Sequence, residues 1–393
     1  MRSGVEVVIA GGGTAGHLSP ALAVARALVA AGTPPEAVRF VGSSRGMERR
    51  LVPEAGFVVT LLPGRGIKRR PAPSNLLAVA ELALATLLAA FLLARWRPRA
   101  VLTVAGYASV PCALAARLCG VPVVVLNVDA VPGAANRLVA RFAAASAVAA
   151  ETTSLPRAVV TGAPVRPEIL GADRGPEGRA KARRALALAE DRLVLAVAGG
   201  SLGARRINEA TIGMARLLQG RSDLAVYHVS GARDHGWVLA ATTGLRDGPP
   251  SGLDYRLVAY EASMWQLLAA CDLLVSRAGA STLAEVTAIG VPSVLVPLPG
   301  APGDRQTRNA RRLEGDGAAV VLDDAGVTPE RLASLATSLL DDPGRRAAMG
   351  EAAHALGRRD AAERVVELLE RVAPARRRAV SGRGDVAAAR SGR

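Results

Sequence analysis

The sequence is poor in aromatic residues, lysine, cysteine and histidine, and each shortage narrows the classes of protein it can encode. Phe, Trp and Tyr make up 3% of the 393 residues, whereas hydrophobic residues make up 50%. The core must therefore be built from alanine, valine and leucine, as in parallel sheets that are covered by helices. The length exceeds that of one ordinary core and predicts two domains.

Lysine occurs only at Lys68 and Lys181, so the net charge of +15 at pH 7 comes from arginine. Two interpretations stay open: the arginine bias of a GC-rich genome, or attraction to anionic substrates, membranes or nucleic acid. Much of the charge falls in residues 373–393, which have no apolar periodicity and are predicted to be a disordered tail. Because no cluster of base-stacking aromatic residues accompanies the arginines, we expect no nucleic-acid partner.

The three cysteines have no CxxC spacing, and each lies in an Ala/Leu-rich stretch as a small hydrophobic residue: Cys112, Cys119 and Cys271. The absence of a disulfide framework is typical of a reducing cytoplasm. The N-terminus leads directly into an expected strand, Val5–Ala10, so we expect no signal peptide.

The longest apolar run, Leu76–Ala94, carries one charge, Glu81, and approaches the length of a membrane span. Basic residues flank it on both sides, and expected strands precede and follow it at the spacing of an α/β fold. We therefore expect a helix of the fold. A true membrane span and a membrane-surface contact by its apolar face stay open as alternatives.

Short apolar, β-branched runs alternate with helical stretches along the whole chain, which predicts right-handed βαβ units and parallel sheets. Twelve strands are expected, in two doubly wound α/β domains of about six strands each: Val5–Ala10, Val38–Gly42, Phe57–Leu62, Ala100–Val104, Val121–Leu126, Val159–Thr161, Leu193–Ala198, Ala225–Val229, Arg256–Ala259, Leu273–Val275, Ser293–Pro297 and Ala318–Leu322. The prolines and glycine of Gly162–Pro167 interrupt both periodicities. We place one domain at 1–162 and another at 163–355, then a helix at 356–372 that packs back on the first domain.

Gly11, Gly13 and Gly16 form a G-x-G-x-x-G pattern between a strand and a helix, a geometry that brings backbone N–H groups close to a diphosphate. An NAD site would need an acidic residue at the end of the second strand, which is absent there. Ser44 and Arg45 keep an NADP enzyme open as an alternative. His17 follows the loop and is predicted to act as a phosphate donor or a general base, with a packing role as the alternative.

A second loop of this kind, Ser276–Glu285, follows another buried strand. The helix that begins there would offer free N–H groups to phosphates. Glu285, about one turn in, is expected to bind ribose hydroxyls, and the alternative is a capping box with Ser281 or Thr282. Farther on, Asp304, Gln306 and Asn309 could present polar groups to a sugar, or only cap a helix.

Together these segments resemble the MurG family of bacterial peptidoglycan glycosyltransferases over about residues 5–370. The resemblance rests on the order and spacing of seven segments: GGGTAGHLSPALAVARAL (11–28), AGYASVP (105–111), PGAANR (132–137), TGAPVR (161–166), AGGSLGARRIN (198–208), SRAGASTLAE (276–285) and PGDRQTRNA (302–310). It implies the GT-B architecture, two Rossmann-like domains that face each other across a cleft. It also implies an inverting transfer of N-acetylglucosamine from UDP-GlcNAc to a lipid-linked muramyl-pentapeptide (lipid I to lipid II), at the cytoplasmic face of the membrane.

The resemblance further implies a set of site residues and no metal or cofactor. The acceptor diphosphate would lie on the first loop and on the loop after the fourth strand: Gly13, Thr14, Ala15, Gly16, Gly106 and Tyr107. The donor would contact positions in the second domain: Arg166, Ser201, Gly203, Ala280, Ser281, Thr282, Leu283, Ala284, Glu285 and Gln306. His17 is the expected base, with Tyr107 as a reserve for positioning the acceptor, and helix N-termini with Arg166 would stabilise the leaving diphosphate.

The chain departs from the family pattern around Leu126–Asp129. The usual His-Glu pair is absent, and Asp129 replaces an asparagine at a donor-sugar position. Leu202 stands where the family has a glutamine, and Ala15 replaces a glycine. These departures leave two alternatives open: a related transferase with another lipid or secondary-metabolite acceptor, and a non-catalytic scaffold of the cell-wall machinery.

Overall fold

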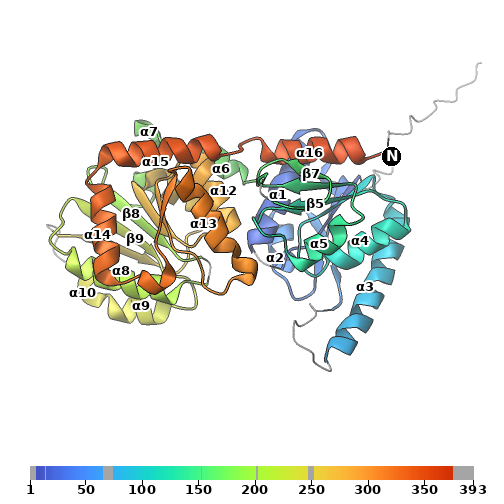
Figure 1. The fold of residues 1–393 in the computed structure, drawn as a ribbon, viewed down its shortest axis with the longest axis horizontal. Coiled ribbons are helices and arrows are strands. Elements are labelled where there is room, and N and C mark those ends of the chain that lie inside the picture. Colours follow the sequence, from blue (N-terminus) through green and yellow to red (C-terminus); the bar gives the residue numbers. More distant parts are fainter. Residues whose placement is uncertain are drawn as a thin grey trace, which may run out of the picture.

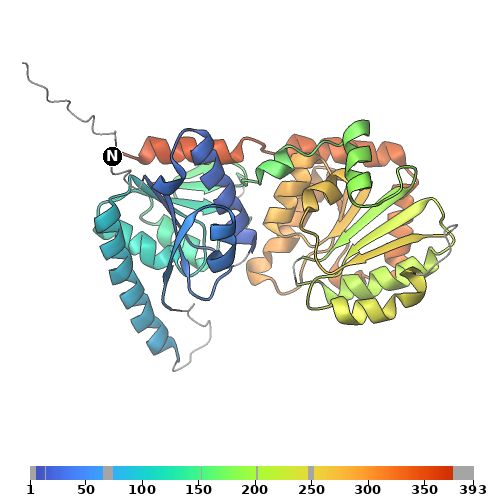
Figure 2. The ribbon, with the colours of Figure 1, turned by 180° about the vertical axis from the view of Figure 1, so that it is seen from behind.

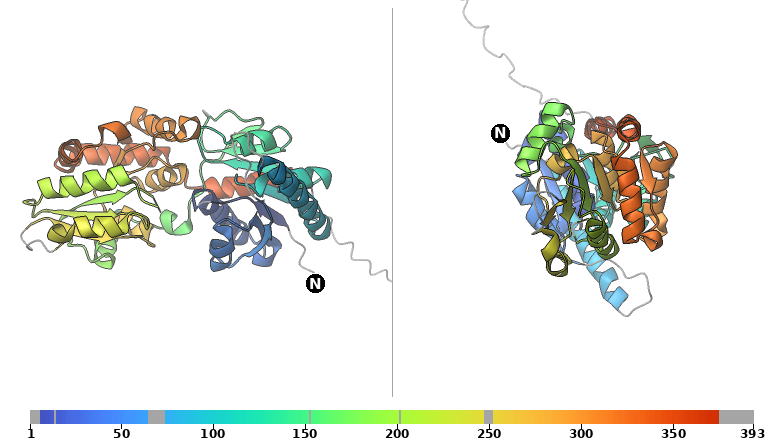
Figure 3. Two further views of the ribbon diagram at one scale, coloured as in Figure 1. Left: turned by 90° about the horizontal axis from the view of Figure 1, so that it is seen from below. Right: turned by 90° about the vertical axis from the view of Figure 1, so that its left-hand side faces the viewer.

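The computed structural model describes residues 6–13, 15–64, 74–151, 153–200, 202–246 and 252–374. Thr14, Ser201, the basic stretch Lys68–Arg70 and residues 375–393 of the expected tail lie outside the described residues. Figures 1 and 3 show two α/β lobes side by side along the long axis, each built on its own sheet.

The first sheet has seven parallel strands in the order β3-β2-β1-β4-β5-β6-β7. Its strands are β1 Val7–Ala10, β2 Val38–Ser43, β3 Val58–Leu62, β4 Ala100–Thr103, β5 Val123–Asn127, β6 Ala145–Val148 and β7 Ala158–Val160. Its helices are α1 Ala15–Ala30, α2 Glu48–Glu54, α3 Ser74–Trp96, α4 Ser109–Leu118 and α5 Ala134–Ala140, with a 3-10 turn η1 at Pro35–Ala37.

The second sheet has six parallel strands in the order β10-β9-β8-β11-β12-β13. Its strands are β8 Leu193–Ala198, β9 Leu224–Val229, β10 Asp254–Val258, β11 Leu273–Ser276, β12 Ser293–Leu295 and β13 Ala319–Val321. Its helices are α6 Pro167–Leu170, α7 Pro176–Ala185, α8 Arg205–Leu217, α9 His235–Ala241, α10 Thr243–Arg246, α11 Met264–Ala270, α12 Ala280–Ile289, α13 Arg305–Gly315, α14 Pro329–Leu340 and α15 Pro343–Leu356, with 3-10 turns η2 Pro302–Asp304 and η3 Asp324–Gly326. The last helix, α16 Ala361–Val372, packs on the first domain.

The two doubly wound parallel sheets confirm the predicted fold class, and each of the twelve expected strands appears to within two residues at its ends. One strand was missed, because β6 reads Ala-Ser-Ala-Val within an alanine-rich stretch that has no alternation and only one β-branched residue. The first sheet therefore has seven strands rather than about six.

The strand order reverses direction beside β1 in the first sheet and beside β8 in the second. At such a switch point the connections after two neighbouring strands run to opposite faces of the sheet and leave a crevice at its carboxyl edge. The loops after β1 and β4 meet at the first switch point, and those after β8 and β11 meet at the second. The glycine-rich segments of the sequence therefore lie where an α/β fold binds ligands.

The helix α3 connects β3 to β4 of the same sheet, and its small residues Ala85 and Ala89 pack into the core beside α4. Because both flanking strands lie in one sheet, α3 is a helix of the fold. It is nevertheless long and apolar enough to cross a membrane by length and composition, with a mean hydropathy of 1.9 and 22% of the stretch buried over Ala78–Trp96. Figure 2 shows it on the side of the first domain away from the second.

The chain passes between the two domains twice. After the second domain is complete, α15 ends at Leu356 and α16 returns to the first domain, along the top of Figure 1. There Val365, Val366, Leu368 and Leu369 join the core formed around β1 and α1. The first domain therefore contains residues from both ends of the described chain.

Candidate active site

The first glycine-rich loop packs backbone against backbone on the loop that follows β4. Gly11 and Gly12 have φ values of 125° and 130°, and the Gly12 N–H donates to the Ala105 carbonyl at 3.0 Å. A Cβ on Gly106 would lie 2.5 Å from the Gly12 carbonyl oxygen, so this approach requires glycine. The loop thereby brings Gly16 and His17 to the cleft at the start of α1.

His17 lines a pocket of about 160 Å³ whose walls come from both domains. The predicted residues Gly106 and Asp129 line it too, on the loops after β4 and β5. Arg305 of α13 enters from the second domain. The ionisable and amide side chains of the lining are His17, Asn127, Asp129, Asn136 and Arg305.

Asp129 forms an ion pair across the domain interface. Its Oδ2 lies 3.0 Å from Nη1 of Arg305, with 16% of the Asp129 side chain and 32% of the Arg305 side chain exposed. The sequence predicted Asp129 as a donor-sugar contact. In the structure, its carboxylate instead pairs with Arg305 beside His17. A role in sugar binding stays a prediction.

Burial lowers the pKa of His17 below its ordinary value, Asp129 opposes this effect, and Arg305 lowers the pKa further. A hydrogen bond with the Gly12 backbone and the charge of Glu48 also raise it. Because the net direction is downward from about 6.5, the imidazole is neutral at pH 7. A neutral imidazole has a nitrogen lone pair and can accept a proton from a sugar hydroxyl.

Two asparagines of this pocket were not singled out from the sequence. Asn136 Nδ2 donates to Asn127 Oδ1 at 3.0 Å, and Asn127 Nδ2 donates to the Asp129 carbonyl at 2.6 Å. Asn136 Oδ1 is buried without a hydrogen-bond partner among the described residues. The position of Asn127 at the carboxyl end of β5 is the signal that could have identified it, whereas Asn136 lies farther on, on α5.

The second glycine-rich loop directs the N-terminus of α12 at the first domain. Gly279 precedes the helix in an extended conformation, and the Ser281 hydroxyl donates to the Gly16 carbonyl at 2.7 Å. The first N–H groups of α12, on Ala280, Ser281 and Thr282, have no acceptor within the helix. The two predicted diphosphate loops therefore contact each other across the cleft.

Glu285 lies on the same helix and pairs with Arg166 of the interdomain linker, with Oε1 3.3 Å from Nη2. Burial raises the pKa of Glu285, and the charge and hydrogen bond of Arg166 oppose the rise. No side chain caps α12, so the capping-box alternative for Ser281, Thr282 and Glu285 is wrong. The carboxylate is instead held at the domain interface by one arginine.

The loop after β8 is held by a buried polar network. A Cβ on Gly203 would lie 2.2 Å from the Ser230 carbonyl oxygen, so glycine is required there. Asn208 Nδ2 donates to that same carbonyl at 3.0 Å, and its Oδ1 lies 2.9 Å from Nε2 of His228. His228 is fully buried and belongs to this structural network.

The polar segment that starts α13 is largely used to hold the protein itself together. Gln306 Oε1 accepts from the Leu298 N–H at 2.9 Å. Asn309 Oδ1 accepts from the Ala130 N–H at 3.1 Å, across the interface. Asp304 Oδ1 accepts from the Thr307 hydroxyl at 2.7 Å. Sugar contacts by these residues stay predictions, and Gln306 would have to release the turn at Leu298 to make them.

Tyr107 does not line the pocket of His17. Its ring packs beside the α3–α4 core, and a Cβ on Gly64 would meet its hydroxyl at 2.0 Å. Burial raises the pKa of Tyr107, as does the negative charge of Glu81 on α3. The hydroxyl is buried without a hydrogen-bond partner among the described residues. The structure thus separates Tyr107 from the expected base and places it near the N-terminal half of α3.

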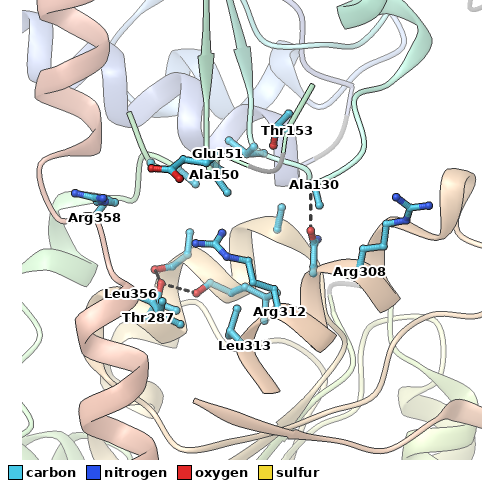
Figure 4. A pocket seen from close by; sticks show the side chains of 18 of the residues that line it. Ala130, Ala150, Glu151, Thr153, Thr287, Arg308, Arg312, Leu313, Leu356 and Arg358 are labelled. Atoms are coloured by element: carbon cyan, nitrogen blue, oxygen red, sulfur yellow. Dashed lines mark hydrogen bonds between the residues drawn. The ribbon is translucent and has the colours of Figure 1, made fainter. Parts of the chain in front are cut away.

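A larger cleft of about 720 Å³ lies beside this site, between the carboxyl ends of β5–β7 and the helices α12 and α13. Figure 4 shows Arg312 directed toward Ala150 and Glu151 of the first domain, and Arg358 entering from the C-terminal crossing. Three predicted donor positions, Ala280, Leu283 and Ala284, face this cleft, whereas Ser281 contacts Gly16. The predicted residues of α12 are therefore divided between two surfaces.

The described residues contain no group of three or more His, Cys, Asp or Glu side chains placed to hold a metal ion.

Two domain families match the chain: the glycosyltransferase family 28 N-terminal domain over residues 7–148, and the family's C-terminal domain over residues 194–365. The chain belongs to glycosyltransferase family 28, and its two facing Rossmann-like domains have the GT-B architecture. This assignment argues against the NADP enzyme kept as an alternative.

Among the relatives is a protein of Acidothermus cellulolyticus named UDP-N-acetylglucosamine--N-acetylmuramyl-(pentapeptide) pyrophosphoryl-undecaprenol N-acetylglucosamine transferase. It is 40% identical over 377 residues, which cover 95% of this chain and 99% of that protein. A protein of the same name from Desulforudis audaxviator is 36% identical, covering 94% and 99%. The crystal structure of Acinetobacter baumannii MurG is similar with a TM-score of 0.72 and 29% identity, covering 93% of this chain and 99% of that one.

Proposed function

We propose that this protein transfers N-acetylglucosamine from UDP-GlcNAc, with inversion, to a lipid-linked muramyl-pentapeptide, converting lipid I to lipid II in peptidoglycan synthesis. The names of its full-length relatives support this reaction. The observation that carries it is the contact between the two glycine-rich loops, in which Ser281 donates to the Gly16 carbonyl at 2.7 Å beside His17. This contact brings a diphosphate-binding helix and a candidate base to one place.

The second domain holds the donor. The free N–H groups at the start of α12 and the cation of Arg166 stabilise the negative charge that develops on the departing diphosphate. Glu285 accepts hydrogen bonds from the ribose hydroxyls, exchanging its present partner Arg166 for the nucleotide. Ser201 and Gly203 line the donor site from the loop after β8, with Gln306 toward the sugar.

The first domain holds the acceptor. Gly13, Thr14, Ala15 and Gly16, with Gly106, cradle the acceptor diphosphate, and Tyr107 supports the second of these loops. His17 removes the proton from the attacking sugar hydroxyl. That oxygen forms a bond to C1 of the donor on the face opposite the leaving group, so the configuration at C1 inverts.

The exposed face of α3 supports a peripheral location at the cytoplasmic surface of the membrane. Val79, Leu84, Leu87, Leu88 and Phe91 project there, and the exposed Arg95 and Arg97 follow at the end of the helix. An apolar helix face with adjacent arginines suits an anionic lipid surface. Because Tyr107 lies against the same helix, the acceptor loop would face the membrane that carries the lipid-linked substrate.

The test is a transfer assay with radiolabelled UDP-GlcNAc and a lipid I analogue, with the anomeric configuration of the product read by NMR. We expect a β-linked disaccharide product. Glu285→Gln should raise the KM for UDP-GlcNAc about 10- to 100-fold, since the loss of a charge-assisted hydrogen bond costs about 1.5–3 kcal/mol. Glu54→Gln, which removes an exposed carboxylate paired with Arg50 on α2, is the matched control and should leave KM unchanged.

A related transferase with another acceptor is the second candidate, favoured by the departures at Leu126–Asp129 and at Leu202. Transfer to a different glycolipid, with none to the lipid I analogue, would replace the proposal by this alternative. Failure to bind or hydrolyse UDP-GlcNAc, with unimpaired cell-wall complementation by Glu285→Gln, would favour the scaffold.

A further inference from the structure

The pocket around His17 contains two opposite charges from different domains. Asp129 follows β5 of the first domain, and Arg305 begins α13 of the second, with 3.0 Å between Oδ2 and Nη1. Both line the same pocket of about 160 Å³ as the imidazole. Each is less than one third exposed, so their field at His17 is screened less than that of surface charges.

Charged groups face His17 from three elements among the described residues. Asp129 acts from the loop after β5, Arg305 from α13 and Glu48 from α2. Glu48 is buried within the first domain, where its Oε1 accepts from the Ser43 N–H at 3.3 Å. Its position therefore does not depend on the second domain. The Asp129–Arg305 pair, in contrast, needs both domains, because each contributes one of its two residues.

We infer that Asp129 and Arg305 are positioning residues for proton transfer, with Asp129 stabilising the imidazolium that His17 becomes and Arg305 holding Asp129 in place across the closed cleft. The inference rests on the proposed function, in which His17 is the base. It assigns to Asp129 a role other than the donor-sugar contact expected from the sequence.

In this reaction the proton of the acceptor hydroxyl moves to His17. The acceptor hydroxyl forms its bond to C1 of the donor and gives its proton to a nitrogen of His17, while the C1–O bond breaks and UDP leaves with the electron pair. A positive imidazolium then lies in a pocket whose burial disfavours charge. Asp129 offsets that cost, and Arg305 limits the offset so that the imidazole stays neutral before the reaction.

The experiment measures the pKa of His17 in the full chain by NMR titration, with His17→Gln identifying its signal among the four histidines. It also records the acid limb of the pH profile of kcat/KM. Asp129→Asn should lower the pKa of His17 by about one unit and move the acid limb to lower pH, since it removes a negative charge. Arg305→Gln should raise the pKa and move the limb to higher pH. The double variant should return both close to the wild-type values.

Arg26→Gln is the matched control, because it breaks another interdomain ion pair, Arg26–Glu168 at 2.9 Å, away from the pocket. It should leave the pKa of His17 unchanged. Shifts of the same sign in Asp129→Asn and Arg305→Gln, or no shift in either, would overturn the inference. Absence of transfer by the wild-type enzyme would instead refute the proposed function, and the NMR titration separates the two outcomes.

Discussion

Two polar residues of this protein lie at the carboxyl ends of parallel strands. Asn127 is the last residue of β5, and His228 is the penultimate residue of β9. Asn127 lines the same pocket as His17. His228 is sealed inside the second domain, with Nδ1 2.6 Å from the Tyr255 hydroxyl and Nε2 2.9 Å from Asn208 Oδ1. The same kind of position thus lines the candidate active site in one domain and joins a buried polar network in the other.

His228 should make the protein sensitive to acid. Burial lowers its pKa to about 3, and His235 adds to this effect. The unfolded chain therefore binds a proton below about pH 6.5 that the folded chain does not bind, and the free energy of unfolding falls as the pH falls. Urea unfolding of His228→Gln between pH 6.5 and 4.5 should show a loss smaller by on the order of 2–3 kcal/mol than in the wild type.

The difference between the wild type and His228→Gln isolates the contribution of His228 to the pH dependence of unfolding. The lowered pKa of His17 makes the same contribution in both proteins and cancels from the difference. His228→Gln should also be less stable near pH 7, because the buried Tyr255 hydroxyl loses a well-placed partner. Parallel pH dependences in the two proteins would show that His228 does not couple protonation to unfolding.

Some residues of the candidate site could be predicted from the sequence and others could not. His17, Ser281 and Glu285 lie within glycine-rich segments whose strand–loop–helix context restricts where they can lie. Arg305 is separated from Asp129 by 176 positions, so no local pattern indicates that they form a pair. The capping box that was the alternative for Glu285 is not formed, because Gly279, and not a serine, precedes the helix.

Helices and strands show the same difference between features that a short stretch of sequence predicts and features that depend on contacts with distant parts of the chain. The alternation of β-branched and helical stretches located twelve strands, because it reports burial of each segment independently of its neighbours. The strand β6 was not predicted, because its alanines have a low β-propensity. It is a strand because it pairs with β5 and β7. The helix α3 is the reverse case, in which composition alone could not separate a core helix from a membrane segment.

The exposed face of α3 should decide vesicle binding. Leu87 is 68% exposed, and Leu87→Glu would place a charge among its apolar neighbours. In flotation with vesicles of phosphatidylglycerol and phosphatidylcholine, binding should fall about tenfold or more, because a carboxylate is both poorly buried and repelled by anionic lipid.

Leu217→Glu is the matched control, since Leu217 is a similarly exposed leucine on α8 of the second domain. It should bind vesicles like the wild type. If the Leu87→Glu variant binds vesicles at the wild-type level, α3 does not form the membrane contact.

At the scale of the whole molecule, two crossings of the chain join the domains. One runs through Gly162–Pro167, where a Cβ on Gly162 would meet Arg358 of the other crossing at 2.3 Å. Arg359 donates to the carbonyl of Ala288 at 2.8 Å and tethers the second crossing to the second domain. Because the two crossings lie side by side, rotation about them would open the cleft on the opposite side and separate Ser281 from Gly16.

Leu369→Ala should destabilise the first domain, although the residue comes from the C-terminal end of the described chain. Leu369 is buried in the core around β1 and α1. The expected cost is about 2–5 kcal/mol for removal of a fully buried leucine side chain. Hydrogen–deuterium exchange should show faster exchange in β1 and β4 and little change in β8.

Leu340→Ala on α14 is the matched control, because it removes an equally buried leucine from the core of the second domain. It should accelerate exchange in β8 and spare β1. The same pattern in both variants would mean that the two cores unfold as one unit.

The return of α16 to the first domain also bears on how the protein is made. A ribosome completes β1–β7 before it reaches Val365–Leu369, so the nascent first domain lacks these core residues during synthesis of the entire second domain. The second domain, which contains all its own strands in one continuous segment, can close first. The domain that is translated earliest is thus the one whose core receives its last residues at the end of the described chain.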